Sequence, residues 1–392
     1  MARGRVVVFA RNGGQILLDQ VGEERVTPLS APADRPVADT VRTTIEELFV
    51  ADQHTVRCLS TQDAGASAVL VDVPKRQLRP DAPVAHPVWM HASELRSVEG
   101  DVWNAYRAVA PTVESVCGDR THGSTTLSIE ALEVLRDHAA AADRADTELR
   151  STARQLATCR PDMIALGVRI DRTISQAGDR LEQLASICED EIDRAVTVDR
   201  AAAKHAATLC PDEPILTLSR SETVEQTLQL AEPPRVIVLR ADPGGEGVSF
   251  AESLAARGLD VAIAPDAAVG HILATESIGS VLVGADAIAP DSSMYNKLGT
   301  RTVATLASIH RVPTLVVTAS DKVAPELPPP RDRIDPTEIH AHTNSLALEC
   351  PLFDHTPADL LSAIITEDGI RSPEQIAAIA DRHRALQAWR RG

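Results

Sequence analysis

The chain has 392 residues, 44% of them hydrophobic, so it is long and apolar enough for roughly two or three packed domains. Its formal net charge of −17 argues against tight, non-specific binding to nucleic acid or to an anionic membrane. The sequence has no apolar run of about 18 residues that would predict a transmembrane helix. The apolar stretch Val6–Phe9 is too short for a signal peptide, so we expect a cytoplasmic protein.

The basic residues are almost all arginine, and lysine occurs only at Lys75, Lys204, Lys297 and Lys322. Few lysines, many carboxylates and 2% aromatic residues are typical of proteins adapted to concentrated salt, which screens charge repulsion. An ordinary acidic protein from a GC-rich mesophile is the alternative. The six cysteines include no C-x-x-C pair, so the sequence predicts neither a zinc knuckle nor a redox motif.

Residues 1–95 have the pattern of an α/β domain. Two short apolar runs, Arg5–Ala10 and Gln15–Leu18, flank the sequence Asn-Gly-Gly, which is typical of the turn in a β-hairpin. We predict a helix over Val37–Phe49 and a further strand over Ala66–Val73.

Residues 96–121 contain few turn-forming clusters, and we predict a linker with one connecting helix. In residues 122–212, apolar side chains then recur every three or four positions, beginning with Leu127, Leu132 and Leu135. No heptad persists for three repeats, so this pattern favours a small helical bundle over a coiled coil. The later helices are predicted at Thr147–Cys159, Ala165–Ala177 and Leu181–Leu209.

Residues 213–392 alternate short apolar runs with helical patterns. The runs begin 20 to 34 residues apart, which predicts parallel βαβ units, a doubly wound Rossmann-like sheet and an α/β fold class. A proline-rich break is expected at Pro325–Arg333 and a closing helix at Ser372–Arg391. The predicted strands are Ile215–Leu218, Val236–Leu239, Val261–Ala264, Val281–Val283 and Leu315–Thr318.

Polar segments, three of them with glycine, follow several of these strands: Ser219–Glu222, Arg240–Gly247, Gly284–Asp286 and, opening another helix, Asn296–Thr300. In open parallel sheets, ligands bind beyond the carboxyl ends of the strands. Backbone amides at a helix N-terminus, glycines that allow close approach and a cationic side chain together make a phosphate site. The four segments therefore predict a phosphate-binding crevice.

These segments resemble the initiation factor 2B alpha/beta/delta family, which includes ribose-1,5-bisphosphate isomerase and methylthioribose-1-phosphate isomerase. The resemblance covers about residues 122–370, and its strongest part is Val281–Ile288 followed by Asn296–Thr300. It implies a helical domain over 122–212 and a Rossmann-like domain over 213–392 that forms a homodimer or larger assembly. Further motifs agree in order: Arg160-Pro161, Ile215–Ser221, Glu246-Gly247, Phe353-Asp354 with Thr356-Pro357, and Thr366–Gly369.

The resemblance also implies site residues. Isomerases of this family use a cysteine and an aspartate to move a proton between adjacent sugar carbons, and the aspartate corresponds to Asp286. The cysteine position holds Ser219, whose hydroxyl is a far weaker proton carrier than a thiol. The family's phosphate-binding arginine is replaced by Asp242. Ligand contacts are expected from Arg160, Arg240, Gly245, Glu246, Gly247, Asn296 and Lys297.

Several of these residues also have a purely structural interpretation. Asp286 could cap a helix that follows the strand. Asn296 and Lys297 could hold the edge of the sheet, and Ser219 could be only a small residue at a strand end. His122, in front of the first predicted helix, could belong to a helix cap.

A second resemblance, over Asp34–Leu48, is to a Nudix box, in which a helix presents glutamates to Mg²⁺ at a diphosphate. Glu46 and Glu47 remain, and one or two carboxylates with substrate phosphate could hold Mg²⁺. Their side chains diverge by roughly 100° on a helix, so both would have to lean inwards. The depleted box predicts a Nudix-like fold without hydrolysis. The box's glycine and two of its glutamates are replaced by Pro28, Asp34 and Thr43.

We therefore predict a Nudix-like domain fused to an initiation-factor-2B-type module. The expected function is non-catalytic: a regulatory or translation-linked protein that binds a sugar phosphate or nucleotide, self-associates and could contact initiation factor 2. The first alternative is an aldose–ketose isomerase of a phosphorylated ribose, against which Ser219 and Asp242 count. The second is a Nudix hydrolase, against which Pro28 and Thr43 count. Neither a membrane nor direct nucleic-acid binding is expected, and Mg²⁺ at the Nudix-like domain is the one cofactor considered.

Overall fold

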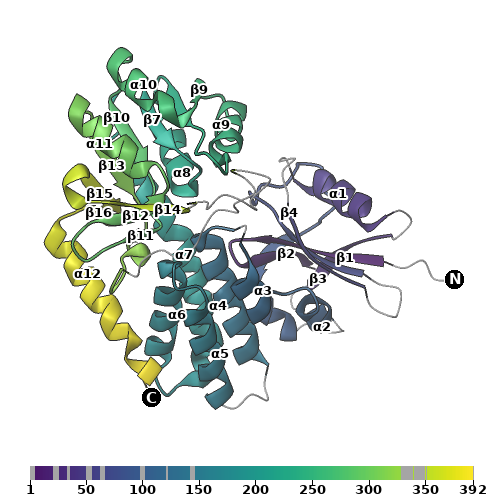
Figure 1. The fold of residues 1–392 in the computed structure, drawn as a ribbon. Helices are drawn as coiled ribbons and strands as arrows, with labels where there is room; N and C mark the ends of the chain where they lie inside the picture. Colours follow the sequence, from purple (N-terminus) through teal and green to yellow (C-terminus); the bar gives the residue numbers. More distant parts are fainter. Residues whose placement is uncertain are drawn as a thin grey trace, which may run out of the picture. The chain divides into compact units, whose positions relative to one another are not determined.

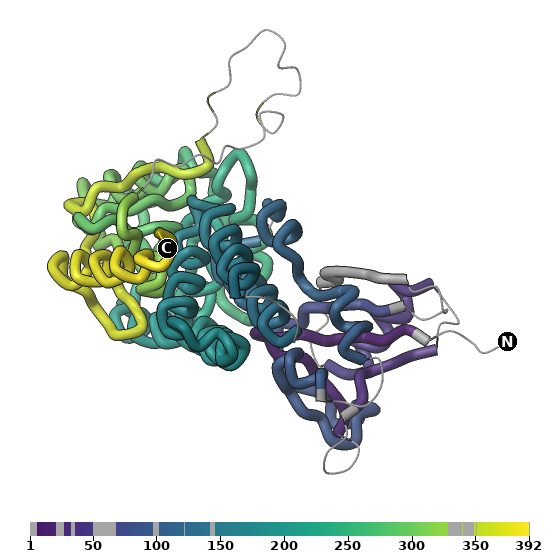
Figure 2. Tube along the Cα trace, turned by 90° about the horizontal axis from the view of Figure 1, so that it is seen from below, coloured from purple at the N-terminus to yellow at the C-terminus, as the bar shows by residue number. Residues whose placement is uncertain are grey.

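The computed structural model describes residues 5–20, 26–32, 36–49, 55–61, 67–97, 102–120, 122–141, 146–327, 339, 349 and 351–391. Its contacts divide the chain into two compact units, Met1–Leu156 with Gln176–Asp193, and Ala157–Ser175 with Arg194–Gly392. The predicted domain limits at 95, 121 and 212 do not coincide with these units and stay a prediction. Figure 1 labels the elements of each unit, and Figure 2 follows the chain trace from a second direction.

The first unit contains a six-stranded mixed sheet. Its strands are β1 (Arg5–Asn12), β2 (Gln15–Gln20), β3 (Val26–Pro32), β4 (Thr55–Thr61), β5 (Ser67–Asp72) and β6 (Pro87–His91). They lie in the order β4-β5-β1-β3-β2-β6, and only β1 and β5 pair in parallel. The predicted hairpin of β1 and β2 is confirmed; Gly13 and Gly14 in its turn have φ of 57° and 75°, a region that favours glycine.

Helices cover both faces of this sheet because side chains alternate along its strands. On one face, Val8 packs in a core that includes α1 (Val37–Leu48), the helix predicted from the sequence. On the other face, Phe9 meets Tyr106 of α2 (Val102–Arg107) edge to face, with ring centroids 5.6 Å apart.

The predicted single helix of the linker is wrong. Residues 92–118 form the 3₁₀ turn η1 (Ala92–Ser97), α2 and α3 (Val113–Gly118). Pro111 lies between the two α-helices, and a proline cannot continue a helical hydrogen-bond ladder. Thr112 then starts α3 through a capping box with Ser115.

Four longer helices confirm the predicted helical region: α4 (Ser124–Ala140), α5 (Asp146–Cys159), α6 (Ile164–Ala177) and α7 (Leu184–Ala207). The last is shorter than predicted, because residues 181–183 form the separate 3₁₀ turn η2 (Leu181–Gln183). No helix of the described ranges is both long and apolar enough to cross a membrane.

The first unit also buries a cluster of charges between its sheet and α4. Arg11 of β1 donates hydrogen bonds to Asp72 Oδ1 (2.7 Å), to Glu130 Oε1 (2.9 Å) and to Glu133. Burial raises the pKa of Glu133 to about 7, because desolvation outweighs the attraction of Arg11 and Arg136. One guanidinium is thus shared among three carboxylates.

The second unit contains a seven-stranded sheet in the order β16-β15-β13-β10-β7-β8-β9. All five predicted strands are present and pair in parallel, and β15 extends the parallel set, whereas β16 is antiparallel. The strand order reverses between β7 and β10, which is where open α/β sheets bind ligands. The strands are β7 (Ile215–Leu218), β8 (Val236–Leu239), β9 (Val261–Ala264), β10 (Ser280–Val283), β13 (Thr314–Val317), β15 (Ala363–Thr366) and β16 (Gly369–Arg371).

Two apolar clusters pack helices against the two faces of this sheet. One face packs against the end of α7 and against α8 (Glu222–Ala231) and α9 (Glu246–Ala256). The opposite face packs against α10 (Val269–Thr275), α11 (Thr300–His310) and α12 (Pro373–Leu386). The closing helix predicted from Ser372 is thus confirmed, and it ends in the 3₁₀ turn η7 (Gln387–Arg391). The further 3₁₀ turns are η3 (Asp266–Ala268), η4 (Ser320–Lys322) and η6 (Ala358–Leu360).

A small antiparallel sheet lies beside the large one and consists of β11 (Ala287–Ile288), β12 (Met294–Lys297) and β14 (Phe353–Thr356). The carboxylate of Asp354 accepts the backbone N–H groups of Gly299 (2.9 Å) and Arg301 (3.2 Å), so it caps the start of α11. Of the proline-rich break predicted at Pro325–Arg333, residues 328–333 lie outside the described residues.

Candidate functional site

The candidate site lies at the carboxyl ends of β7 and β10, which are neighbours in the sheet. Ser219 follows β7 directly, and Asp286 follows β10 after two small residues. A side chain at Gly284 would come 2.8 Å from the hydroxyl of Ser221, so glycine lets the two strand ends approach. The fold therefore brings two of the predicted site segments together.

Asp286 is half-buried, and its backbone N–H donates to the carbonyl of Tyr295 (3.0 Å). Burial raises the pKa of its carboxyl group, and the ammonium groups of Lys322 and Lys297 oppose that rise. Asp286 does not cap a helix, because β11 follows it. A carboxyl group with a raised pKa beside two cations is suited to taking up and releasing a proton.

Lys322 is the site residue that sequence reasoning missed. It ends η4, the turn after β13, and its Nζ donates to the carbonyl of Ala285 (2.8 Å), the residue before Asp286. The sequence did hold a signal, because two of the chain's few lysines, Lys297 and Lys322, meet at this carboxylate.

Lys297 and Glu246 form an ion pair across the site, with 2.5 Å between Nζ and Oε1. Glu246 starts α9, and a side chain at the next residue, Gly247, would lie 2.2 Å from the carbonyl of Leu239. Only glycine fits there. Gly245 precedes the helix with φ 71° and donates its N–H to the Ala241 carbonyl.

Asn296 has a structural role, because its amide donates to the hydroxyl of Thr300 (2.9 Å) at the start of α11. The ammonium group of Lys297 pairs with Glu246 and its charge acts on Asp286, so a structural role and a ligand contact both stay predictions.

In the loop after β8, the positive charge of Arg240 compensates the negative charge of Asp242. Arg240 pairs with Asp242 at 2.9 Å, and both side chains are about half exposed. The guanidinium also lies 3.7 Å from the position that a side chain on Gly245 would take. Asp266 accepts the N–H groups of Ala241 (2.9 Å) and Asp242 (2.6 Å) and so fixes this loop.

Ser219 is buried and has φ 64°, a left-handed conformation that non-glycine residues seldom adopt. Three residues later, Glu222 starts α8; burial raises the pKa of its carboxyl group, while Arg220 and Lys322 oppose the rise. Arg160 lies buried in the turn between α5 and α6, so its contact with a ligand stays a prediction.

The carboxylates of the predicted Nudix box lie on α1. Glu46 and Glu47 are exposed and line an open pocket of about 550 Å³ with Arg79 and Asp81. Within the described ranges, no three acidic, histidine or cysteine side chains gather closely enough to hold a metal ion. Binding of Mg²⁺ by Glu46 and Glu47 together with a substrate phosphate stays a prediction, and Asp34 lies outside the described residues.

Comparison with known proteins finds a family match for the larger part of the chain. The model of the initiation factor 2 subunit family matches residues 120–373. The ribose 1,5-bisphosphate isomerase of Haloferax volcanii is 28% identical over 282 residues, which are 66% of this chain and 86% of that protein. A probable bifunctional methylthioribose-1-phosphate isomerase/methylthioribulose-1-phosphate dehydratase of Nocardia farcinica is 28% identical over 57% of this chain, and the match spans only 46% of that protein.

The fold has solved counterparts. The crystal structure of the Pyrococcus horikoshii translation initiation factor eIF-2B superimposes with a TM-score of 0.56 at 24% identity and covers 66% of this chain and 94% of its own. At this identity the likeness establishes the mixed α/β fold alone. Residues 1–119 lie outside the family match.

Proposed function

The chain belongs to the initiation factor 2 subunit family, and on that premise we propose that it binds a ribose phosphorylated at C1 and converts it into the open-chain ketose. The observation that carries this proposal is Asp286, held with a raised pKa beside two ammonium groups at the switch point of a parallel sheet. Relatives named as isomerases of ribose 1,5-bisphosphate and methylthioribose 1-phosphate support it. The isomerase is therefore preferred to the non-catalytic interpretation.

The reaction needs two proton movements. When C1 carries a phosphate, the bond between C1 and the ring oxygen breaks, the hydrogen on C2 moves to C1, and the proton on O2 moves to the ring oxygen. Asp286 takes the C2 proton and delivers a proton to C1, while Lys297 and Lys322 stabilise the negative charge that develops on oxygen. The hydroxyl of Ser219 relays the second proton, because it can accept one proton while donating its own.

The loop before α9 is the proposed phosphate-binding region. It leads into the start of an 11-residue helix, whose dipole favours an anion, and Arg240 lies over Gly245 at its edge. Since Arg240 already neutralises Asp242, this loop does not repel an anion as strongly as its sequence suggests. A phosphate in this loop would compete with Glu246 for the ammonium group of Lys297.

The proposal is tested by incubating the protein with ribose 1,5-bisphosphate and following ketose formation by ³¹P NMR. Asp286→Asn should lower the rate by roughly 10²–10⁴-fold while the ligand still raises the melting temperature. Lys297→Ala should weaken that thermal shift, and Glu47→Gln on α1 serves as the unaffected control. Ketose formation at the wild-type rate in Asp286→Asn would contradict the assignment.

A non-catalytic binder is the second candidate, and the serine at position 219 favours it. This candidate predicts a thermal shift with ribose 1,5-bisphosphate or a nucleotide, but no ketose. If Ser219→Cys creates turnover that the wild type lacks, the binder is the natural function of this chain.

We also propose that residues 1–95 form a Nudix-like domain without hydrolase activity, which the mixed sheet with α1 supports. The whole protein is proposed to be a cytoplasmic homodimer or larger assembly adapted to high salt, and it could contact initiation factor 2. Light scattering at micromolar protein in molar salt tests the assembly, and a monomer would contradict it.

A further inference from the structure

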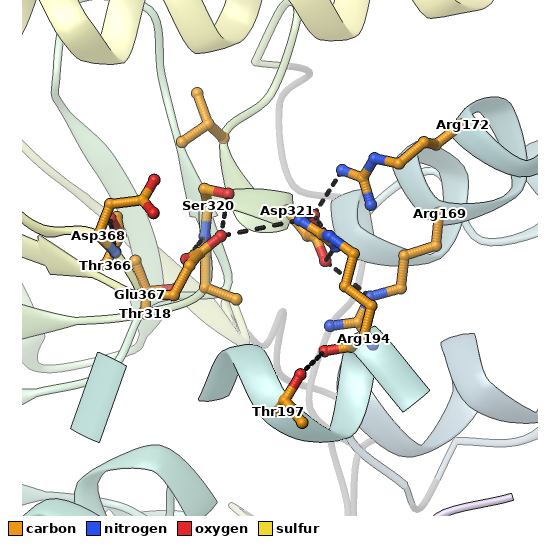
Figure 3. A network of polar contacts seen from close by, with 12 residues as sticks. Arg169, Arg172, Arg194, Thr197, Thr318, Ser320, Asp321, Thr366, Glu367 and Asp368 are labelled. Carbon is orange, nitrogen blue, oxygen red and sulfur yellow. Dashed lines mark hydrogen bonds and ion pairs between the residues drawn. The ribbon is translucent and has the colours of Figure 1, made fainter. Parts of the chain in front are cut away.

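The 3₁₀ turn η4 (Ser320–Lys322), which carries Lys322, is held by an unusual concentration of charge. Figure 3 shows three arginines converging on Asp321, the middle residue of the turn. Arg169 Nε lies 2.9 Å from Asp321 Oδ2, Arg172 Nη2 lies 2.6 Å from Oδ1, and Arg194 contacts both oxygens. The Asp321 side chain is fully buried. The arginines come from α6 and α7, so two helices are tied to one side chain of the turn.

The residue before Asp321 is held as firmly. Glu367, which follows β15, accepts the backbone N–H of Ser320 (2.9 Å) and its hydroxyl (2.5 Å). Arg194 lies 3.7 Å from the same carboxylate and thereby joins the two contacts (Figure 3). Two of the three residues of η4 are therefore fixed by charge-assisted hydrogen bonds, which are among the strongest that proteins form.

The third residue of the turn, Lys322, is the one that reaches the candidate site. Its Nζ donates to the carbonyl of Ala285, and it is the strongest charge acting on Asp286. A lysine side chain on a free loop has many rotamers and would hold no fixed place. A backbone anchored at the two preceding residues removes much of that freedom.

We propose that Asp321, clamped by Arg169, Arg172 and Arg194, is a positioning residue that fixes Lys322 beside Asp286. The proposal rests on the proposed function in one respect: it takes Asp286 to be the group that carries the proton, and it assigns to the three arginines and Asp321 the control of its protonation. It does not require that turnover be observed, because the position of Lys322 alters the protonation of Asp286 whether or not a sugar is bound.

A displacement of Lys322 should be measurable as a change in the pKa of Asp286, because few charges act on that carboxyl group. Lys322 and Lys297 are the charges that act on its carboxyl group. Lys297 is already paired with Glu246, and Lys322 also acts on the carboxyl group of Glu222. Displacing Lys322 therefore removes a cation from Asp286 that no other described group replaces.

The test measures the pKa of Asp286 by ¹³C NMR of the full chain labelled at aspartate carboxyl carbons, with Asp286→Asn identifying the signal. Lys322→Met should raise this pKa by about 1–3, the usual effect of removing a nearby opposite charge. Asp321→Asn and the milder Arg194→Gln should raise it in the same direction by roughly 1. Arg194→Lys, which keeps the charge, should restore part of the difference.

Asp171→Asn is the matched control, because Asp171 is a buried carboxylate of the same unit that pairs with Arg390 (2.7 Å) and not with η4. It should leave the pKa of Asp286 unchanged even if it lowers stability. A folded Arg194→Gln or Asp321→Asn variant with the wild-type pKa at Asp286 would overturn the proposal, and so would an unchanged pKa in Lys322→Met. If the protein turns over sugar phosphate, the pH at which kcat is half-maximal should move with the pKa while KM changes little. If it does not, only the proposed function fails.

Discussion

The two units of the chain bury the same kinds of charged group in opposite proportions. In the second unit, three arginines surround the single carboxylate of Asp321, and their attraction lowers its pKa far below the usual range even though burial opposes this. In the first unit, Arg11 is shared among Asp72, Glu130 and Glu133, and burial raises the pKa of Glu133 to about 7.

The comparison teaches that burial alone does not decide whether a carboxyl group is ionised in this protein. The ratio of nearby cations to carboxylates decides it. At Asp286, burial raises the pKa while two lysines oppose the rise. A group poised in this way can both accept and release a proton, whereas Asp321 is held as an anion.

The largest effect is expected from Asp321→Asn, which removes the carboxylate at the centre of the arginine cluster in the second unit. Removing the one carboxylate takes away the anion that Arg169, Arg172 and Arg194 share, and we expect a loss of about 3–5 kcal/mol in the free energy of unfolding by urea denaturation. Because the folded pKa of Asp321 is lowered, its contribution is present above the unfolded pKa of about 4 and disappears as the pH falls below it. Asp171→Asn, which removes a pair with one arginine, should cost less; an equal or greater loss would contradict the role of the arginine cluster.

Glu133→Gln sharpens the comparison from the other side. A folded pKa of about 7 is raised above the ordinary value of 4.5, so the contribution of Glu133 is fully present below that ordinary value and is lost as the pH rises through 7. The free energy of unfolding of the wild type should therefore fall by roughly 3 kcal/mol across this window, at about 1.4 kcal/mol for each pH unit of difference between the two values. Glu133→Gln should lack this fall. A wild-type stability that rises with pH over the same range would show that Glu133 is ionised in the folded protein.

The smallest effects are expected for the exposed carboxylates on α1. Glu46→Gln and Glu47→Gln should each change the free energy of unfolding by less than about 0.5 kcal/mol, because neither side chain is buried in a network of charges. Isothermal titration with Mg²⁺ should be the same in both variants as in the wild type. Magnesium-dependent hydrolysis of a nucleoside diphosphate derivative that disappears in Glu47→Gln would contradict the expectation that the first unit has no hydrolase activity.

Sequence reasoning recovered the parallel strands of the second unit because fully buried strands are continuous apolar runs bounded by turn residues. It did not recover β12, whose residues Met294–Lys297 carry no apolar pattern and become a strand by pairing with β11 and β14. The segment Asn296–Thr300 was therefore expected to open a helix, whereas α11 begins only at Thr300. Pairing between distant segments overrides the local pattern here.

The candidate site was predictable where it follows a strand and hidden where it depends on contacts between distant segments. Asp286, Glu246 and Lys297 could be found from their places in the chain. Lys322 could not, because its approach to Asp286 is set by Asp321, whose arginine partners lie 127 to 152 positions away in the sequence. Glu133 likewise meets Arg11 across 122 positions. No local pattern encodes such contacts.

The central claim is that Asp286 carries a proton between two sugar carbons, and the most direct test is the reaction in D₂O. The wild type should convert ribose 1,5-bisphosphate into a ketose that carries deuterium at C1, because a half-buried carboxyl group exchanges its proton with solvent between uptake and delivery. Asp286→Asn should bind the same ligand, as measured by its melting temperature, and form no ketose above a residual rate lower by roughly 10²–10⁴-fold. Equal rates of ketose formation for the two proteins would contradict the account.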